Sequence, residues 1–136
     1  MHRIVLAAGC FDLFHVAHLR HLQEARTFGA LLVVGVTEDA GVGKGNGRPV
    51  IPQDERLEII RWLTFVHEAQ LCKDSLEALD YWKPQVFVKG SDYLEKGLLP
   101  AEIEYCKAHD IEIRHTKPNP QTTSGIIERI RQCEFA

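Results

Sequence analysis

The stretch Ile4–Ala25, IVLAAGCFDLFHVAHLRHLQEA, decides the fold of this chain. It begins with a short apolar run rich in branched residues, which predicts a buried strand. Further along, Leu19, Leu22 and Ala25 recur every three residues, as on the core-facing side of a helix. The residues between them, Gly9–His15, are therefore expected to form a strand-to-helix turn. In an open parallel sheet, ligands bind at such turns.

Two histidines, His15 and His18, stand three residues apart at the start of this helix and are expected to face the same side. The N–H groups of a helix start attract anions, and imidazoles add polar groups that can carry positive charge. We therefore predict a phosphate site here; a histidine pair without function is the alternative. A metal site that also uses His21 is disfavoured, because steps of three residues move around the helix by about 60° each.

Length and composition indicate a single domain over residues 1–136. About two thirds of the unfolded surface of such a chain is buried on folding, and 45% hydrophobic and 26% charged residues are ordinary for a globular protein. Sixteen basic and 19 acidic residues give a net charge of −3, which argues against nucleic-acid binding. No apolar run approaches about 18 residues, so no membrane span and no membrane partner is expected.

A cytoplasmic location is expected from two features. Met1-His2-Arg3 leads directly into the first strand pattern, which leaves no room for a signal peptide. The four cysteines are scattered, with no Cys-x-x-Cys pair, and are most simply explained as reduced thiols.

Further apolar runs alternate with helical patterns along the chain. Buried strands are predicted at Leu31–Val36 and Val86–Val88, a half-buried edge strand at Ile111–His115, and a short strand or extended link at Phe65–Leu71. With helices between them, this order predicts an α/β fold, a doubly wound, mainly parallel five-stranded sheet with helices on both faces, as in Rossmann-like proteins.

The glycine-rich segment Gly41–Pro49 is unsuited to a core and is expected to be a mobile surface loop. It is not a P-loop, because neither Ser nor Thr follows Lys44 and no helix starts there. We interpret it as a flexible arm whose Lys44 and Arg48 reach phosphates. A plain solvated linker is the alternative.

Polar side chains follow three further predicted elements. Asp39 lies just after the second strand and either contacts substrate or caps a turn. Lys89–Tyr93 forms the turn that leaves the third core strand, with Tyr93 in the core or the pocket wall. Thr122, Thr123 and Ser124 begin the last helix with hydroxyls that are typical of helix caps.

Four of these segments together resemble the cytidylyltransferase-like nucleotidyltransferases. The family signature G-x-F-D-x-x-H-x-G-H reads here as Gly9–His18, with Ala17 in place of the second glycine. Arg48–Arg56 is similar to the family's second conserved segment. Lys89–Tyr93 is similar to a turn of its sugar-phosphate branch, and Thr122–Ile130 to its third motif.

The resemblance implies that a nucleoside monophosphate moves from a nucleoside triphosphate to a small phosphorylated sugar or polyol, with release of pyrophosphate. It implies catalytic roles for His15, His18, Lys44 and Arg56. The implied nucleotide-binding residues are Gly9, Cys10, Phe11, Asp12, Lys89, Gly90, Thr122, Thr123 and Ser124. The implied substrate-binding residues are Asp39, Asp92 and Tyr93. Mg²⁺ is expected to arrive with the triphosphate rather than in a protein cage, and relatives suggest a homodimer.

The choice of nucleotide stays open. Gly47–Val50, Val88–Tyr93 and Thr122–Ile127 look closest to heptose 1-phosphate adenylyltransferases, which favours ATP. Glycerol 3-phosphate cytidylyltransferases, which use CTP, are the alternative, but the arginine before their last helix is absent from Lys117–Gln121. Archaeal-type FAD synthetases are a second, more distant alternative. A non-catalytic nucleotide-binding module is an alternative of another class, because Ala17 adds a methyl group beside the triphosphate.

Overall fold

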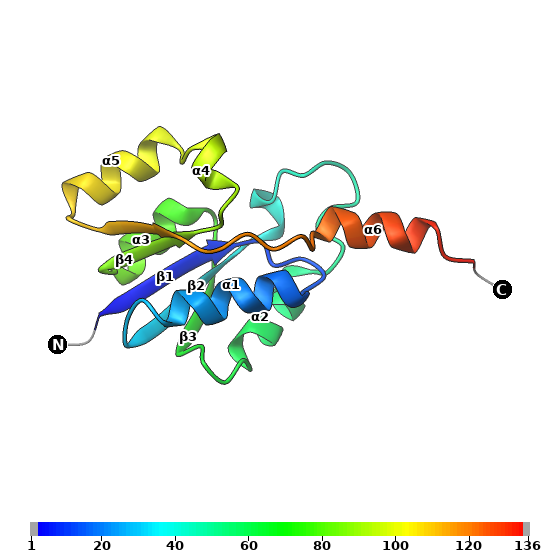
Figure 1. Cartoon of the computed structure of the whole chain (residues 1–136), viewed down its shortest axis with the longest axis horizontal. Helices are drawn as coiled ribbons and strands as arrows, with labels where there is room; N and C mark the ends of the chain where they lie inside the picture. The colour runs from blue at the N-terminus through cyan, green and yellow to red at the C-terminus, as the bar shows by residue number, and fades with distance from the viewer. Residues whose placement is uncertain (1–2, 135–136) are drawn as a thin grey trace.

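Five parallel strands form one sheet in the order β3-β2-β1-β4-β5 (Figure 1). A computed structural model describes residues 3–134, so Met1 and His2, which enter the expectation about a signal peptide, lie outside it. The strands are β1 (Ile4–Gly9), β2 (Leu31–Thr37), β3 (Glu68–Cys72), β4 (Val86–Lys89) and β5 (Glu112–His115). The predicted α/β fold is confirmed, with a sheet that is wholly rather than mainly parallel.

Helices cover both faces of the sheet. The helices are α1 (Val16–Arg26), α2 (Gln53–Arg61), α3 (Ser75–Trp82), α4 (Tyr93–Lys96), α5 (Pro100–Ala108) and α6 (Thr123–Arg131), with a 3-10 turn, η1 (Asp39–Gly41). Helices α1 and α2 pack on one face, and α3 and α5 pack on the other. Helix α6 extends away from the sheet, beyond the carboxyl ends of the strands (Figure 1).

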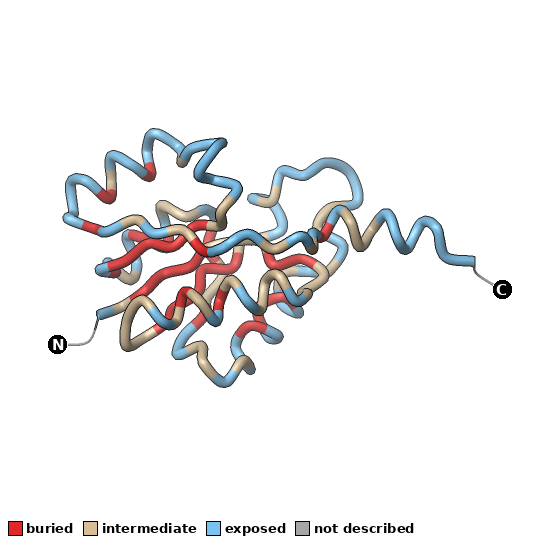
Figure 2. The backbone as a smooth tube through the Cα atoms, viewed as in Figure 1, coloured by how far each residue is buried: buried red, intermediate tan, exposed pale blue. Residues whose placement is uncertain are grey.

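The alternation of side chains along the buried strands supplies both layers of the core. In β1, Val5 and Ala7 pack with Leu22 of α1 and Ile60 of α2, whereas Leu6 packs on the opposite face. The buried residues follow the central strands, while α6 is mostly exposed (Figure 2). Removal of these apolar side chains from water is the main driving force for this arrangement.

The strand order reverses beside β1, and this positions the functional site. From β1 the chain moves outward to β2 and β3, then crosses to β4 on the other side of β1 and continues to β5. The loops that leave β1 and β4 therefore diverge to opposite faces, which opens a crevice at the carboxyl ends of the strands.

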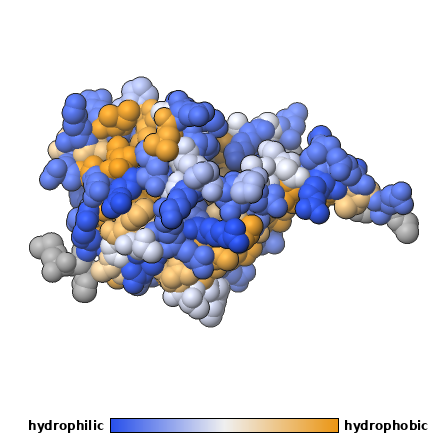
Figure 3. Space-filling model, in the orientation of Figure 1, coloured by the Kyte–Doolittle hydropathy of each residue, from blue (hydrophilic) through white to orange (hydrophobic). Residues whose placement is uncertain are grey.

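The surface is mixed in character. Figure 3 shows hydrophobic side chains gathered over the region of α4 and α5, where Leu94, Leu99 and Ile103 are exposed. Within residues 3–134, none of the helices has the length and apolar character needed to cross a membrane.

Candidate active site

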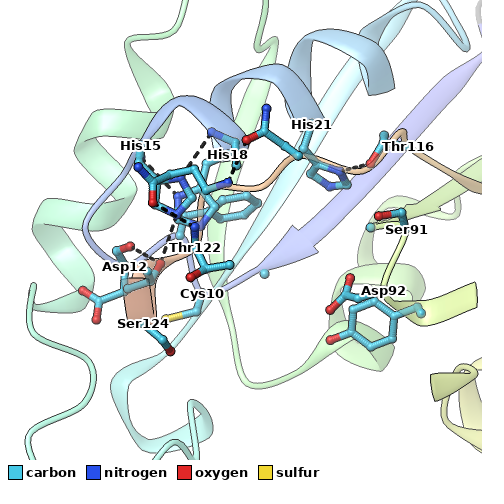
Figure 4. A pocket seen from close by; sticks show the side chains of 18 of the residues that line it. Cys10, Asp12, His15, His18, His21, Ser91, Asp92, Thr116, Thr122 and Ser124 are labelled. Atoms are coloured by element: carbon cyan, nitrogen blue, oxygen red, sulfur yellow. Dashed lines mark hydrogen bonds between the residues drawn. The ribbon is translucent and has the colours of Figure 1, made fainter. Parts of the chain in front are cut away.

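A cavity of about 430 Å³ opens at the carboxyl ends of the strands, between the starts of α1 and α6 (Figure 4). Its wall brings together most of the predicted site residues from segments far apart in the sequence. These are Gly9, Cys10, Phe11, Asp12, His15, His18, Lys44, Gly90, Asp92, Tyr93, Thr122, Thr123 and Ser124. The turn after β1 and the start of α6 therefore face the same space.

His15 caps the start of α1 and ties that start to α6. Its Nδ1 accepts a hydrogen bond from the backbone N–H of Ala17 at 3.2 Å, so the proton of the neutral ring is on Nε2. The Nε2–H donates to the hydroxyl of Thr123 at 3.2 Å, and that hydroxyl donates to the carbonyl of Asp12 at 3.1 Å. Burial lowers the pKa of His15, so the ring is neutral near pH 7.

His18 lines the cavity, and its Nε2 has no hydrogen-bond partner among residues 3–134. Its Nδ1 accepts the backbone N–H of His15 at 3.4 Å, which again leaves the ring proton on Nε2. Burial, reinforced by the neighbouring His15, His21 and Lys44, lowers the pKa of His18 to about 3. The ring stacks on His15 with centroids 3.8 Å apart. The paired histidines are therefore neutral hydrogen-bond donors in the free protein, not the cations that the sequence allowed.

Asp12 fixes the glycine-rich loop to the turn after β1. Its buried carboxylate accepts the N–H groups of Val50 and Ile51 at 2.8 and 2.9 Å and lies 3.5 Å from Nε of Arg48. Burial raises the pKa of Asp12, but these hydrogen bonds and the Arg48 charge outweigh burial and lower it. The loop expected to be mobile is thus tied down at its far end, and Asp12 acts on the loop as well as lining the cavity.

Arg56 and Asp39 do not line the cavity, contrary to expectation. The guanidinium of Arg56 is fully buried and donates to the carbonyls of Ile51 and Cys10 and to the carboxylate of Asp39, at 2.7–2.9 Å. It is also not a solvent-exposed arginine of helix α2. Arg56 instead joins the turn after β1, the loop and η1, and its donors are used within the protein.

Lys89 is likewise held away from the cavity that Gly90 lines. Its Nζ lies 3.4 Å from the buried carboxylate of Glu102 and 4.2 Å from the ring centre of Tyr93. Glu102 also accepts the hydroxyl of Ser75 at 2.6 Å. Lys89 therefore supports the wall of the cavity from behind, where nucleotide contact was expected.

Comparison with known proteins identifies the family of this chain. The model of the cytidylyltransferase-like family matches residues 6–129, nearly the whole chain. The chain belongs to the cytidylyltransferase-like family of nucleotidyltransferases. It is 40% identical over 133 residues to the bifunctional protein HldE of Geotalea uraniireducens, and 37% identical over 132 residues to that of Pelobacter propionicus. The matches cover 95% and 94% of this chain but 27% of each relative, so the chain spans about a quarter of their length.

Solved structures show the same fold. A lipopolysaccharide core biosynthesis protein from Thermoplasma volcanium superposes with a TM-score of 0.74 at 27% identity, over 88% of this chain and 99% of that one. A protein of unknown function from Archaeoglobus fulgidus gives a TM-score of 0.65 at 21% identity, over 83% of this chain and 88% of that one. The second match supports the fold alone.

The nucleotidyltransferase cavity also includes residues that the sequence analysis did not select as site residues. Apart from Arg48, which was expected to reach phosphates and also lines the cavity, they are Ala8, Ala17, His21, Ser91, Thr116, Lys117, Asn119 and Gln121. Four of them follow β5, a parallel strand whose carboxyl end lies at the same sheet edge as those of β1 and β4. The rule that selected the turns after β1 and β4 would have found this segment, had it been applied to the edge strand.

The charges around the cavity suit an anionic ligand. Lys44, Arg48 and Lys117 line it, against the carboxylates of Asp12 and Asp92. Helix α6 adds first-turn N–H groups, which have no partner inside a helix. Among residues 3–134, no group of three or more His, Cys, Asp or Glu side chains is arranged to hold a metal ion.

Proposed function

We propose that this nucleotidyltransferase transfers AMP from ATP to a small sugar phosphate and releases pyrophosphate. The convergence of His15, His18 and the N-terminus of α6 on one cavity carries the proposal, because a triphosphate needs donors along its whole length. The phosphate of the acceptor attacks the α-phosphorus, a new P–O bond forms, and the bond to the β-phosphate oxygen breaks.

A phosphate acceptor is a competent nucleophile at neutral pH, so the reaction needs no general base. Catalysis then rests on positioning and on stabilisation of charge on the α-phosphate and the leaving pyrophosphate. His18 suits this role, because its Nε2–H has no partner among the described residues. His15 can join it when its Nε2–H moves from Thr123 to a phosphate oxygen.

The other predicted residues take more specific roles in the proposal. Lys44 neutralises charge on the leaving group from the exposed part of the loop. The hydroxyl of Thr123 is already used, so Thr123 contributes its backbone N–H, while the exposed Ser124 contributes hydroxyl and N–H. Arg56 and Lys89 hold the walls in place rather than touching phosphate.

Mg²⁺ fits the proposal as a companion of the triphosphate. The carboxylate of Asp12 is occupied by two backbone N–H groups and by Arg48, so it is not free to act as a metal ligand. When bound, the ion would neutralise charge on the phosphate oxygens. The chain's own contribution is the set of imidazole, ammonium and amide donors.

Support for ATP and a sugar phosphate comes from two sources. The sequence resembles heptose 1-phosphate adenylyltransferases, and the chain is similar to proteins named HldE. The segment Lys117–Gln121 lacks the arginine that precedes the last helix of the cytidylyltransferases, which weakens the CTP alternative. A homodimer is part of the proposal and is tested by sedimentation of the purified chain.

The test is a pyrophosphate-release assay that crosses ATP, CTP, GTP and UTP with heptose, hexose and glycerol phosphates. We expect release with ATP and a sugar 1-phosphate, and none when the acceptor is omitted. Release only with CTP and glycerol 3-phosphate would establish the alternative acceptor and nucleotide.

A non-catalytic nucleotide-binding module is the second candidate, and Ala17 is the observation that favours it. Ala17 lines the cavity, at the position where the family signature has glycine. Binding of ATP by calorimetry, without pyrophosphate release at saturating acceptor, would support this candidate and contradict the transferase.

A further inference from the structure

His21 lies in the cavity wall but outside the phosphate-facing pair. It follows His18 by three residues on α1 and is half-buried. Its Nδ1 lies 2.6 Å from the hydroxyl of Thr116, the residue that follows β5. Thr116 is itself buried, and its backbone N–H donates to the carbonyl of Lys89 at 3.0 Å. His21 therefore has a fixed place, and the Nε2 of its ring has no partner among residues 3–134.

The partner of Nδ1 distinguishes His21 from the other two histidines. A backbone N–H donates to Nδ1 of both His15 and His18, so each neutral ring must carry its proton on Nε2. The hydroxyl of Thr116 can either donate or accept, so the proton of His21 can be on either nitrogen. Nε2 of His21 can consequently serve as donor or acceptor, whereas Nε2 of His15 and His18 can only donate.

This difference corresponds to a difference between ligands. Phosphate oxygens without protons only accept hydrogen bonds, and they suit the two fixed donors. A hydroxyl both donates and accepts, and it suits a ring that can do the same. Ser91 and Asp92 lie in the wall of the same cavity, on the segment that follows β4, and offer a further hydroxyl and a carboxylate (Figure 4).

We propose that His21 and Thr116 form a subsite that recognises a hydroxyl group of a polyhydroxylated ring, and so act as specificity residues of the transferase. The inference rests on the proposed function, because the ring is the ribose of the nucleotide or the sugar of the acceptor. Burial lowers the pKa of His21 to about 4, which keeps the imidazole neutral near pH 7 and preserves both modes of hydrogen bonding.

The experiment pairs two variants with ligands that lack single hydroxyls. His21→Phe removes both ring nitrogens at similar size, and Thr116→Val removes only the hydroxyl. Pyrophosphate release is measured with ATP, 2′-deoxy-ATP and 3′-deoxy-ATP, and separately with the acceptor sugar phosphate and its deoxy analogues. One hydroxyl should matter in the wild type, raising KM about tenfold when it is absent.

In His21→Phe, KM for the parent substrate should rise about tenfold. KM for the deoxy analogue should then equal KM for the parent substrate in this variant. The kcat value should stay within about threefold, because the reacting phosphates are elsewhere. Thr116→Val should raise KM about threefold, since the ring loses its orienting partner. The substrate whose missing hydroxyl raises KM in the wild type but not in His21→Phe, ATP or the acceptor, is the one that supplies the hydroxyl.

The control is His109→Phe, which changes an exposed histidine directly after α5 and outside the cavity. If removal of the ligand hydroxyl raises KM by the same factor in the wild type, His21→Phe and Thr116→Val, the inference is overturned. The proposed transferase function would not be affected by this result. If the wild type releases no pyrophosphate, the proposed function fails, and calorimetric binding of ATP, the acceptor and their deoxy analogues decides on His21 independently. If His21→Phe does not fold, the same comparison of KM values in Thr116→Val tests the inference.

Discussion

Arg56 and Lys44 are both cations for which the family resemblance implies a catalytic role, and the structure uses them in opposite ways. The guanidinium of Arg56 is fully buried and donates hydrogen bonds to two carbonyls and to Asp39. Lys44 is exposed in the wall of the cavity, between glycines that have open space around them. A buried cation with satisfied donors holds the wall, whereas an exposed cation beside the cavity is available to a ligand.

His18 and Lys89 repeat this contrast. In the described part of the chain the Nε2–H of His18 has no partner and lies at the cavity, while the Nζ of Lys89 is paired with Glu102 behind it. Variants of residues whose donors are available to a ligand, such as His18 and Lys44, should lose activity without losing stability. Variants of residues whose donors are used within the protein, such as Arg56 and Lys89, should lose stability first.

Arg56→Met should give the largest effect. The carbonyls of Cys10 and Ile51 lose their partner inside the protein, so the free energy of unfolding should fall by about 3–5 kcal/mol. Urea unfolding measures the loss, with Arg20→Met, an exposed position on α1, as the control. A fully stable Arg56→Met protein with a raised KM for the nucleotide would place Arg56 with the ligand-binding class.

His18→Ala should lower kcat by roughly 10²–10³, the scale for loss of one preorganised donor. The ring is partly buried beside Phe11 and Phe14, so circular dichroism should accompany the kinetics. His67→Ala offers a matched change at an exposed histidine outside this cavity. Activity within threefold of the wild type would remove His18 from the catalytic machinery.

Lys44→Ala should reduce kcat by roughly 10- to 100-fold, at or below the range for a fixed donor, because the side chain stands on an exposed loop. The melting temperature should be unchanged, since the neighbouring glycines Gly43 and Gly45 have positive φ angles and no atoms near their Cβ positions. Lys44→Arg should keep most of the activity. A large fall in melting temperature would show that Lys44 is structural, as Arg56 is.

Much of this site was predictable from the sequence, and the reasons are local. Short apolar runs and glycine-bounded turns gave the strands, and the carboxyl ends of parallel strands share one sheet edge. The roles of Arg56 and Lys89 depend instead on partners distant in the chain: Cys10 lies 46 residues from Arg56, and Glu102 lies 13 residues from Lys89. A sequence pattern shows that a cation is present but not whether its donors are already used.

The neutrality of the histidine pair was unpredictable for a related reason. A helix start favours anions, and this suggested groups that can carry charge. Burial against Phe11 and Phe14, together with backbone N–H groups on both Nδ1 atoms, instead stabilises the neutral rings. The N–H of His15 finds its partner only when the turn and the first turn of α1 have folded together.

Stability should decrease as the pH falls below about 6.5. The pKa values of His18 and His21 in the folded protein are about 3 and 4, below the ordinary 6.5, so the unfolded chain binds more protons in this range. The free energy of unfolding should fall by about 1–2 kcal/mol per histidine between pH 7 and pH 5. Urea unfolding of His18→Gln should show a shallower decline, and identical curves would mean that His18 is charged when folded.

Ala17→Gly should give the smallest effect, and its two parts have opposite signs. Restoring the family's glycine removes a methyl group from the cavity wall, so KM for the nucleotide should fall by about threefold. Glycine within the first turn of α1 should lower the free energy of unfolding by about 0.5–1 kcal/mol. Ala17→Ser, which keeps a side chain at this position, is the control for the gain in affinity. An unchanged KM would mean that the methyl group does not reach the triphosphate, and the argument for a non-catalytic module would then lose its only structural support.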